Sequence, residues 1–169
     1  MKKTVLTFGL IGGALSSAMM LATLPFVDAI GFDKGAIIGY TTIVLSSLMV
    51  FFGIRSYREN VAGGRITFGR GFLVGLLITL LSCACYVVTW EVIYFKLMPG
   101  FGDKFAAQMV ESVRASGANQ AQIDEAAANA KQFKAMYDKP GMNAALTFVE
   151  PFPIGLAITL ISAGILRKK

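Results

Sequence analysis

The chain has 169 residues, of which 55% are hydrophobic and 15% are charged, and its formal net charge is +6 at pH 7. This composition is too apolar for an ordinary soluble domain. The chain has no histidine, which removes the commonest general base, haem ligand and zinc ligand. A nucleic-acid-binding domain is disfavoured as well, because the basic residues are split among several sites beside apolar runs instead of forming one patch.

Four long apolar runs account for the hydrophobic content: residues 4–25, 36–54, 72–95 and 146–166. A helix rises about 1.5 Å per residue, so roughly 20 apolar residues cross the hydrocarbon of a bilayer. We therefore predict an all-α fold, in which a single membrane domain over residues 1–169 forms an integral four-helix bundle. The connection at residues 96–145 is the only segment long enough to fold outside the membrane.

The first run follows Lys2 and Lys3, so a cleaved signal peptide is one reading of it. The apolar stretch is longer than the about 7 to 15 residues of a signal core, however. Small residues also recur in it at four-residue spacing, as Gly9, Gly13 and Ser17 and as Ala14, Ala18 and Ala22. Small residues at this spacing let helix backbones approach closely in lipid, so we expect the run to be retained as a packed helix.

The link between the second and third runs is rich in glycine and carries four arginines: Arg55, Arg58, Arg65 and Arg70. Arginine binds phosphate with two N–H groups, and each basic residue near an anionic leaflet contributes about 1 kcal/mol. We expect these arginines to contact lipid headgroups and anchor the link; a specific ligand is the alternative. No Gly-Lys-Ser/Thr follows the glycines, so the link is not a nucleotide-binding loop.

The third and fourth runs each carry a face of small and hydroxylated residues. In the third run this face consists of Gly71, Gly75, Thr79, Ser82, Tyr86 and Thr89, and in the fourth of Gly155, Thr159, Ser162 and Ala163. We predict that the two helices pack together through these faces; a polar conduit is the alternative. Gly75→Leu and Ser82→Leu should then disturb folding more than Val74→Leu or Leu81→Phe.

Two cysteines of the third run, Cys83 and Cys85, point about 200° apart on a helix and cannot readily bond to each other. Their spacing does not match a redox or zinc motif. We expect them to be buried as small hydrophobic residues.

Two acidic residues, Glu91 and Glu150, lie in or beside apolar runs, where a charge is costly and therefore marks a candidate functional site. Trp90 and Tyr94 flank Glu91 and are typical of the headgroup level. We expect both carboxylates at the outer ends of their helices, where Glu91 meets water or pairs with Lys96. A proton- or cation-binding pair is the alternative, and the prolines beside Glu150 favour it because they free backbone carbonyls.

The long connection predicts a helical hairpin. Phe101, Phe105, Met109 and Val113 give its first helix an apolar side, and Ser116-Gly117 ends that helix. Asn119 caps a second helix, which Lys139-Pro140-Gly141 stops. The apolar side of this second helix consists of Ile123, Ala127, Ala130, Phe133 and Tyr137. We expect the two helices to pack on each other; recognition of a partner is the alternative.

Orientation follows from lysine and arginine, which are retained on the cytoplasmic side. Nine of the 16 basic residues lie at the two termini and in the Arg55–Arg70 link. The other seven are spread over Lys34 and the long connection. We therefore predict a multi-pass protein of the bacterial inner membrane with both termini in the cytoplasm.

Three segments resemble the bacterial membrane proteins grouped as domain of unknown function 4199: residues 53–59, 64–70 and 86–94. The similarity extends over nearly the whole chain. It implies a four-helix inner-membrane protein with a long connection between the third and fourth spans. The family supplies no catalytic or binding residues.

Our leading functional prediction is a non-enzymatic protein with a structural or accessory role, acting through helix packing and its outer hairpin. A small ion- or proton-coupled transporter, functional as an oligomer, is the second hypothesis, although inverted repeats are lacking. A membrane enzyme acting on lipid is the third, and it lacks a recognisable nucleophile with its base. We predict no catalytic residue, cofactor or metal. The expected partners are the bilayer and either a second copy or another membrane protein, without nucleic acid.

Overall fold

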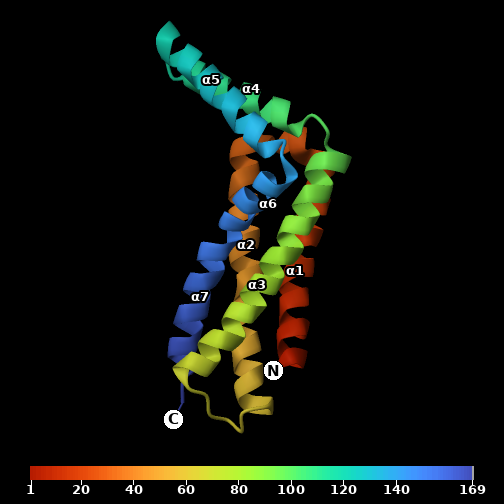
Figure 1. Ribbon diagram of the computed structural model, residues 1–169, viewed down its shortest axis with the longest axis vertical. Helices are drawn as coiled ribbons and strands as arrows, with labels where there is room; N and C mark the ends of the chain where they lie inside the picture. Colours follow the sequence, from red (N-terminus) through yellow and green to blue (C-terminus); the bar gives the residue numbers. More distant parts are fainter. Residues whose placement is uncertain (169) are drawn as a thin grey trace. The chain divides into compact units, whose positions relative to one another are not determined.

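The computed structural model describes residues 1–168 and confirms the all-α prediction over that range. Its helices are α1 (Lys2–Thr23), α2 (Val27–Asn60), α3 (Phe68–Val92), α4 (Phe101–Ala115), α5 (Gln120–Tyr137), α6 (Pro140–Val149) and α7 (Pro151–Leu166) (Figure 1). A 3₁₀ turn, Leu24–Phe26, joins α1 to α2, and a π-helical turn, Ile93–Leu97, follows α3.

The chain divides into two compact units. The bundle unit comprises residues 1–89 together with the chain from Phe148 onward, and the hairpin unit is Trp90–Thr147. Thus α1, α2, α7 and most of α3 belong to the bundle unit, whereas α4 and α5 belong to the hairpin unit.

Three helical stretches are long and apolar enough to cross a membrane: Lys2–Asn60, Phe68–Leu97 and Pro140–Leu166. These stretches indicate a multi-pass membrane protein. The count differs from the predicted four because helical structure runs through the expected loop between the first and second runs. The backbone nevertheless departs from helical geometry within that stretch, at Gly31 (φ 73°, ψ 167°).

Within the bundle unit, α1 lies alongside α2 (Figure 1). A Cβ on Gly12 would lie only 3.2 Å from the Ser46 carbonyl oxygen, so the two helices approach at backbone distance. This contact requires a reversal of the chain between them. The clearest break in helical geometry between the two contacting stretches is at Gly31, whose positive φ of 73° is not helical.

The bundle unit buries small and hydroxylated residues beside an aliphatic core that includes Ile54 and Ile78, and many other large aliphatic residues are exposed. The buried polar side chains are Ser16, Thr42, Ser46, Thr79, Thr159 and Ser162. Exposed aliphatic side chains include Leu6 and Leu10 on α1, Ile37 on α2, Val88 on α3 and Ile165 on α7. A water-soluble bundle would show the reverse, because its association depends on removing apolar surface from water.

One end of the bundle unit gathers both chain termini and the link between α2 and α3 (Figure 1). An apolar cluster that includes Ile54, Tyr57, Ile66 and Leu166 packs there against Phe8. The link is held to the chain beyond α7 by an antiparallel bridge, in which the backbone N–H groups of Ile66 and Lys168 donate to each other's carbonyls at 3.0 and 2.9 Å.

The hairpin unit is built around aromatic rings. Phe133 of α5 packs against Phe105 of α4 and stacks on Tyr137, with ring centroids 5.6 and 4.8 Å apart. Asn119 caps α5 through a reciprocal pair of bonds with Gln122, each 3.0 Å long.

The end of the hairpin unit holds one element that the sequence analysis missed. The predicted stop at Lys139-Pro140-Gly141 ends α5, but Pro140 also begins α6. Proline is well suited to the first position of a helix, where its missing N–H has no partner to lose. As a result, ten helical residues precede Glu150.

Candidate functional site

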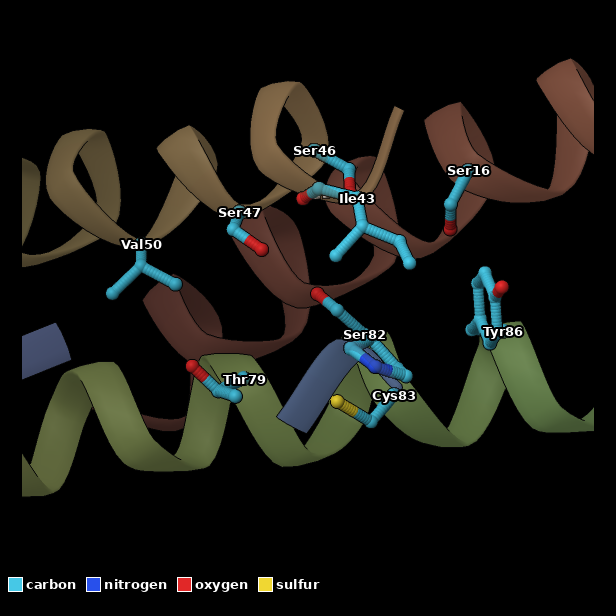
Figure 2. A pocket seen from close by; sticks show the side chains of 10 residues that line it. Ser16, Ile43, Ser46, Ser47, Val50, Thr79, Ser82, Cys83 and Tyr86 are labelled. Atoms are coloured by element: carbon cyan, nitrogen blue, oxygen red, sulfur yellow. Dashed lines mark hydrogen bonds between the residues drawn. The ribbon is translucent and has the colours of Figure 1, made fainter. Parts of the chain in front are cut away.

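A pocket inside the bundle unit has a mainly apolar surface, although six of its ten lining residues carry a hydroxyl group. Its lining consists of Ser16 from α1, Ile43, Ser46, Ser47 and Val50 from α2, Thr79, Ser82, Cys83 and Tyr86 from α3, and Pro151 from α7. Figure 2 shows the α2 side chains on one side of this space and the α3 side chains on the other. The pocket has room for about one water molecule.

Helical periodicity brings these residues to the pocket. The α2 residues Ile43, Ser46 and Val50 are three or four positions apart, so they share one face of their helix. The same spacing places Thr79, Ser82 or Cys83, and Tyr86 on one face of α3. The hydroxylated face predicted for the third run therefore supplies much of the lining, whereas sequence reasoning did not single out the α2 serines.

Two of the pocket serines donate to carbonyls of their own helix. Ser16 donates to the Gly13 carbonyl at 2.9 Å and to that of Gly12 at 3.2 Å. Ser46 donates to the Ile43 carbonyl at 3.0 Å. Such bonds satisfy the hydroxyl proton where water is scarce.

Other hydroxyls connect neighbouring helices. Ser82 of α3 donates to the Gly9 carbonyl of α1 at 3.0 Å. Thr79 of α3 and Thr159 of α7 share a hydrogen bond of 3.0 Å. Ser17 of α1 and Thr89 of α3 share another, at 2.7 Å. Interhelical hydrogen bonds in lipid contribute on average about 0.6 kcal/mol each, so together they add a modest stabilisation to the packing.

Glycines allow α3 to approach the helices around it. A Cβ on Gly75 would lie 2.8 Å from both Ile54 Cδ1 and Thr159 Cγ2. A Cβ on Gly155 would lie 2.5 Å from Thr79 Cγ2, and one on Gly71 would make ordinary contacts of 3.5 Å with Ala163. The structure thus places Gly71, Gly75, Thr79, Gly155 and Thr159 at helix contacts.

Gly9 and Gly13 are buried on α1, but two details of the packing differ from what the sequence indicated. Val74 was expected to tolerate substitution by leucine better than Gly75, but its side chain is completely buried. On α1, Ala14, Ala18 and Ala22 are exposed, and the second buried row consists of Gly12 and Ser16. A row of small residues allows a close approach between helices, but the sequence does not show which of several such rows contacts a neighbouring helix.

Tyr86 connects the pocket to a carboxylate. Its side chain is 8% exposed, and its hydroxyl donates to Glu150 Oε2 at 3.0 Å. Glu150 lies at the junction of α6 and α7 with helical backbone angles (φ −69°, ψ −58°), next to the pocket residue Pro151. Glu150 thus lies at the end of α7, as expected, although a further helix, α6, precedes it.

Glu91 has a different environment, in the hairpin unit. Its Oε1 atom is buried and has no hydrogen-bond partner among residues 1–168, and the same is true of Nε1 of Trp90. Glu91 forms no ion pair with Lys96 in this part of the chain. The Trp90 ring packs edge-on against Phe101, with centroids 5.2 Å apart.

The four arginines of the link have two kinds of environment. Arg58 pairs with Glu59 at 2.5 Å and donates to the Leu166 carbonyl at 3.2 Å, while Arg70 donates to the Tyr57 hydroxyl at 3.2 Å. The side chains of Arg55 and Arg65 make no hydrogen bond or ion pair within residues 1–168. Arg58 thus connects α2 to α7 and Arg70 connects α3 to α2, whereas the side chains of Arg55 and Arg65 make no such contact.

Comparison with known proteins identifies the family. The family model described as Protein of unknown function (DUF4199) matches residues 7–168. The chain belongs to this family. The match confirms the resemblance carried by the arginine-glycine link and the Tyr86–Tyr94 segment. No curated protein and no solved structure matches this DUF4199 protein significantly.

Proposed function

We propose that this DUF4199 protein is a non-enzymatic inner-membrane protein with four spans, which acts as a structural or accessory component. The observation that supports this role most directly is that polar side chains of the bundle form hydrogen bonds between helices. Thr79, Ser82 and Thr89 are bonded to hydroxyls or carbonyls of other helices, so the hydroxylated face of α3 serves helix packing.

Four spans are consistent with the lengths of the helices. At about 1.5 Å per residue, the 22 residues of α1 extend about 33 Å, enough to cross the hydrocarbon. Since α1 and α2 lie side by side after a reversal, each contributes a crossing. The 16 residues of α7 extend only about 24 Å, so the fourth span includes part of α6.

The proposed topology places both termini and the arginine link in the cytoplasm and the hairpin outside. The basic residues support it, and so does the position of the termini and the link at one end of the bundle unit (Figure 1).

We test the accessory role with a photo-crosslinking amino acid at position 132, an exposed site on α5, in native membranes. The same amino acid at position 161, an exposed site on α7, is the matched control. We expect a protein adduct of constant mass from position 132 and lipid adducts from position 161. The protein adduct should disappear when Phe133→Ala opens the hairpin. Absence of a reproducible protein adduct at position 132 would contradict the accessory role.

An ion-coupled transporter is the second candidate, and one observation favours it: the Glu150 carboxylate accepts a hydrogen bond from Tyr86, which lines the pocket. Cation or proton flux in proteoliposomes, abolished by Glu150→Gln, would place this candidate first.

A lipid enzyme ranks below both, because Ser16, Ser46 and Ser82 donate to backbone carbonyls and not to a side-chain base.

A further inference from the structure

We propose that the end of the bundle unit that carries the link and the chain termini binds one anionic phospholipid, with its phosphate between Arg65 and Arg167 and its acyl chains against Phe68 and Phe72. This inference goes beyond the accessory role. It also differs from a general attraction of the link arginines to headgroups, because it names one site and adds an arginine from the other end of the chain.

This end of the bundle unit carries a large excess of positive charge. Glu59 is the only acidic residue in residues 1–27, 35–89 and 151–168, and it pairs with Arg58 at 2.5 Å. The basic residues described in the same ranges are Lys2, Lys3, Arg55, Arg58, Arg65, Arg70, Arg167 and Lys168. A surface with this balance of charge favours an anionic partner.

The antiparallel bridge between the link and the chain beyond α7 brings two of these bases together. Because Ile66 pairs with Lys168, Arg65 and Arg167 are diagonal neighbours across the bridge. Diagonal neighbours lie about 7–8 Å apart, within reach of long side chains. Side chains alternate along an extended segment, and Ile66 is buried in the apolar cluster, so the two arginines lie on the opposite, exposed face. Two guanidinium groups so placed can hold one phosphate, each with two N–H groups.

These two arginines have free side chains on a fixed backbone. Neither side chain makes a hydrogen bond or ion pair within residues 1–168. The two bonds of the bridge are 3.0 and 2.9 Å long, and Arg58 donates to the carbonyl of Leu166, next to Arg167, at 3.2 Å. A backbone held in this way loses little conformational freedom when a ligand binds. Retention of basic residues on the cytoplasmic side explains their number at this end but not the pairing of these two.

The surface beside the two arginines is apolar, which favours a lipid over a soluble phosphate ester. Phe68 directly follows Thr67, the residue opposite Arg167 across the bridge, and its side chain is 42% exposed. The Phe68 ring stacks on that of Phe72, one turn further along α3, with centroids 6.3 Å apart. The helical stretch that begins at Phe68 is long and apolar enough to cross a membrane. A ligand that meets both surfaces carries a phosphate next to acyl chains, as an anionic phospholipid does.

Native mass spectrometry of the purified full chain in detergent tests the site. The protein is titrated separately with phosphatidylglycerol, phosphatidylethanolamine, glycerol 3-phosphate and polyglutamate. We expect one phosphatidylglycerol molecule to bind at least about tenfold more tightly than phosphatidylethanolamine, whose ammonium group offsets the charge of its phosphate. Glycerol 3-phosphate has the phosphate ester without the acyl chains, and we expect it to bind much more weakly than phosphatidylglycerol.

Variants then locate the lipid. Arg65→Gln and Arg167→Gln should each weaken phosphatidylglycerol binding by at least about tenfold, because each removes charge-assisted hydrogen bonds to the phosphate. Arg55→Gln is the matched control, since it removes the same charge from an exposed α2 position whose side chain also has no contact within residues 1–168. Arg65→Lys keeps the charge but not the paired N–H groups, and it should give an intermediate affinity. Phe68→Ala should weaken phosphatidylglycerol binding without changing the affinity for glycerol 3-phosphate.

Equal affinities for phosphatidylglycerol and phosphatidylethanolamine would overturn the proposal. Equal losses in Arg55→Gln and Arg65→Gln would overturn the site and leave only a general effect of charge. Glycerol 3-phosphate binding as tightly as phosphatidylglycerol would replace the lipid with a soluble phosphate ester, and binding of polyglutamate alone would assign the surface to an acidic protein. The crosslinking at position 132 does not depend on any of these results, so the accessory role stands or fails separately.

Discussion

The bundle unit and the hairpin unit join their helices through different kinds of residue. The bundle unit encloses glycines and hydroxyls, such as Gly75 and Thr79, and exposes aliphatic side chains such as Ile165. The hairpin unit joins α4 to α5 through aromatic rings and exposes charged residues such as Lys131 and Glu125. Both units consist of helices, so secondary structure does not distinguish them.

The proposed topology accounts for this difference, because it places the bundle unit in lipid and the hairpin unit in water. In lipid, aliphatic side chains gain nothing by burial, and helices associate through close contact and hydrogen bonds. In water, removing aromatic and aliphatic surface from solvent is the main favourable term. A substitution that fills space should therefore harm the bundle unit most, and a substitution that removes apolar surface should harm the hairpin unit most.

The largest effect is expected from Gly75→Leu. The new side chain would collide with Ile54 and Thr159, and overpacking typically costs about 1–3 kcal/mol or more. We expect loss of the folded monomer peak in detergent gel filtration and a large fall in Tm. Gly69→Leu on the same helix is the control, because a Cβ there meets nothing within 4 Å. Equal behaviour of the two variants would argue against close packing of α3.

Phe133→Ala should open the hairpin while leaving the bundle folded. Deleting a partly buried ring that contacts Phe105 and Tyr137 should cost about 2 kcal/mol, somewhat less than for a fully buried phenylalanine. Trypsin should then cut at Lys131 or Lys134 faster than in the parent protein. Gln132→Ala, an exposed neighbour, should not change the rate. A cleavage rate in Phe133→Ala equal to that of the parent protein would show that the rings do not hold the hairpin together.

A smaller effect is expected from pH. The Lys134 ammonium and the Tyr94 hydroxyl donate to Asp138 at 2.7 and 2.8 Å, and these bonds lower the pKa of the Asp138 carboxyl. The same contact with Asp138 raises the pKa of Lys134. The stabilisation by Asp138 is therefore present above the pKa that its carboxyl has in the unfolded chain, and it is lost as the pH falls through the lower, folded value.

Trypsin resistance of the hairpin should accordingly weaken in acid, after correction for the protease's own pH dependence with an unfolded substrate. Asp138→Asn should remove most of this dependence. Asp124→Asn, at an exposed position near the start of α5, should retain it. Persistence of the full acid dependence in Asp138→Asn would assign it to another group.

The smallest effect is expected from Glu91→Gln, which should leave expression, membrane insertion and Tm nearly unchanged. The Glu91 side chain takes part in no hydrogen bond or ion pair within residues 1–168, so neutralising it removes no such contact. A large pH-dependent change in Tm on this substitution would instead favour a proton-binding role for Glu91.

The sequence predicts features that follow from the periodicity of residues along a helix. It does not predict which of several similar helix faces packs against a neighbouring helix. The helices of the hairpin and the small-residue face of α3 follow from residue spacing. The choice of Gly12 and Ser16 over the alanine row of α1 depends on contacts with α2 that no local pattern contains. Likewise, Pro140 ends one helix and begins another, and sequence reasoning used only the first property.

The candidate site shows the same division. Tyr86 and Glu150 stood out in the sequence for separate reasons, as a member of a helix face and as an acid beside prolines. Their hydrogen bond joins positions 64 residues apart and was not predictable from either segment. Ser46 and Ser47 were missed because serines are common in membrane helices, and only the three-dimensional arrangement shows that they face the hydroxyls of α3.

The central claim, that the two units fold in different surroundings with the hairpin outside the cell membrane, is tested most directly by cysteine labelling. In a background with Cys83→Ala and Cys85→Ala, Gln120→Cys and Val61→Cys introduce exposed thiols in the hairpin and in the link. After the outer membrane has been made permeable, an impermeant maleimide should label position 120 without disruption of the inner membrane. Position 61 should be labelled only once that membrane is opened. Labelling of position 61 alone in intact inner membranes would contradict this topology.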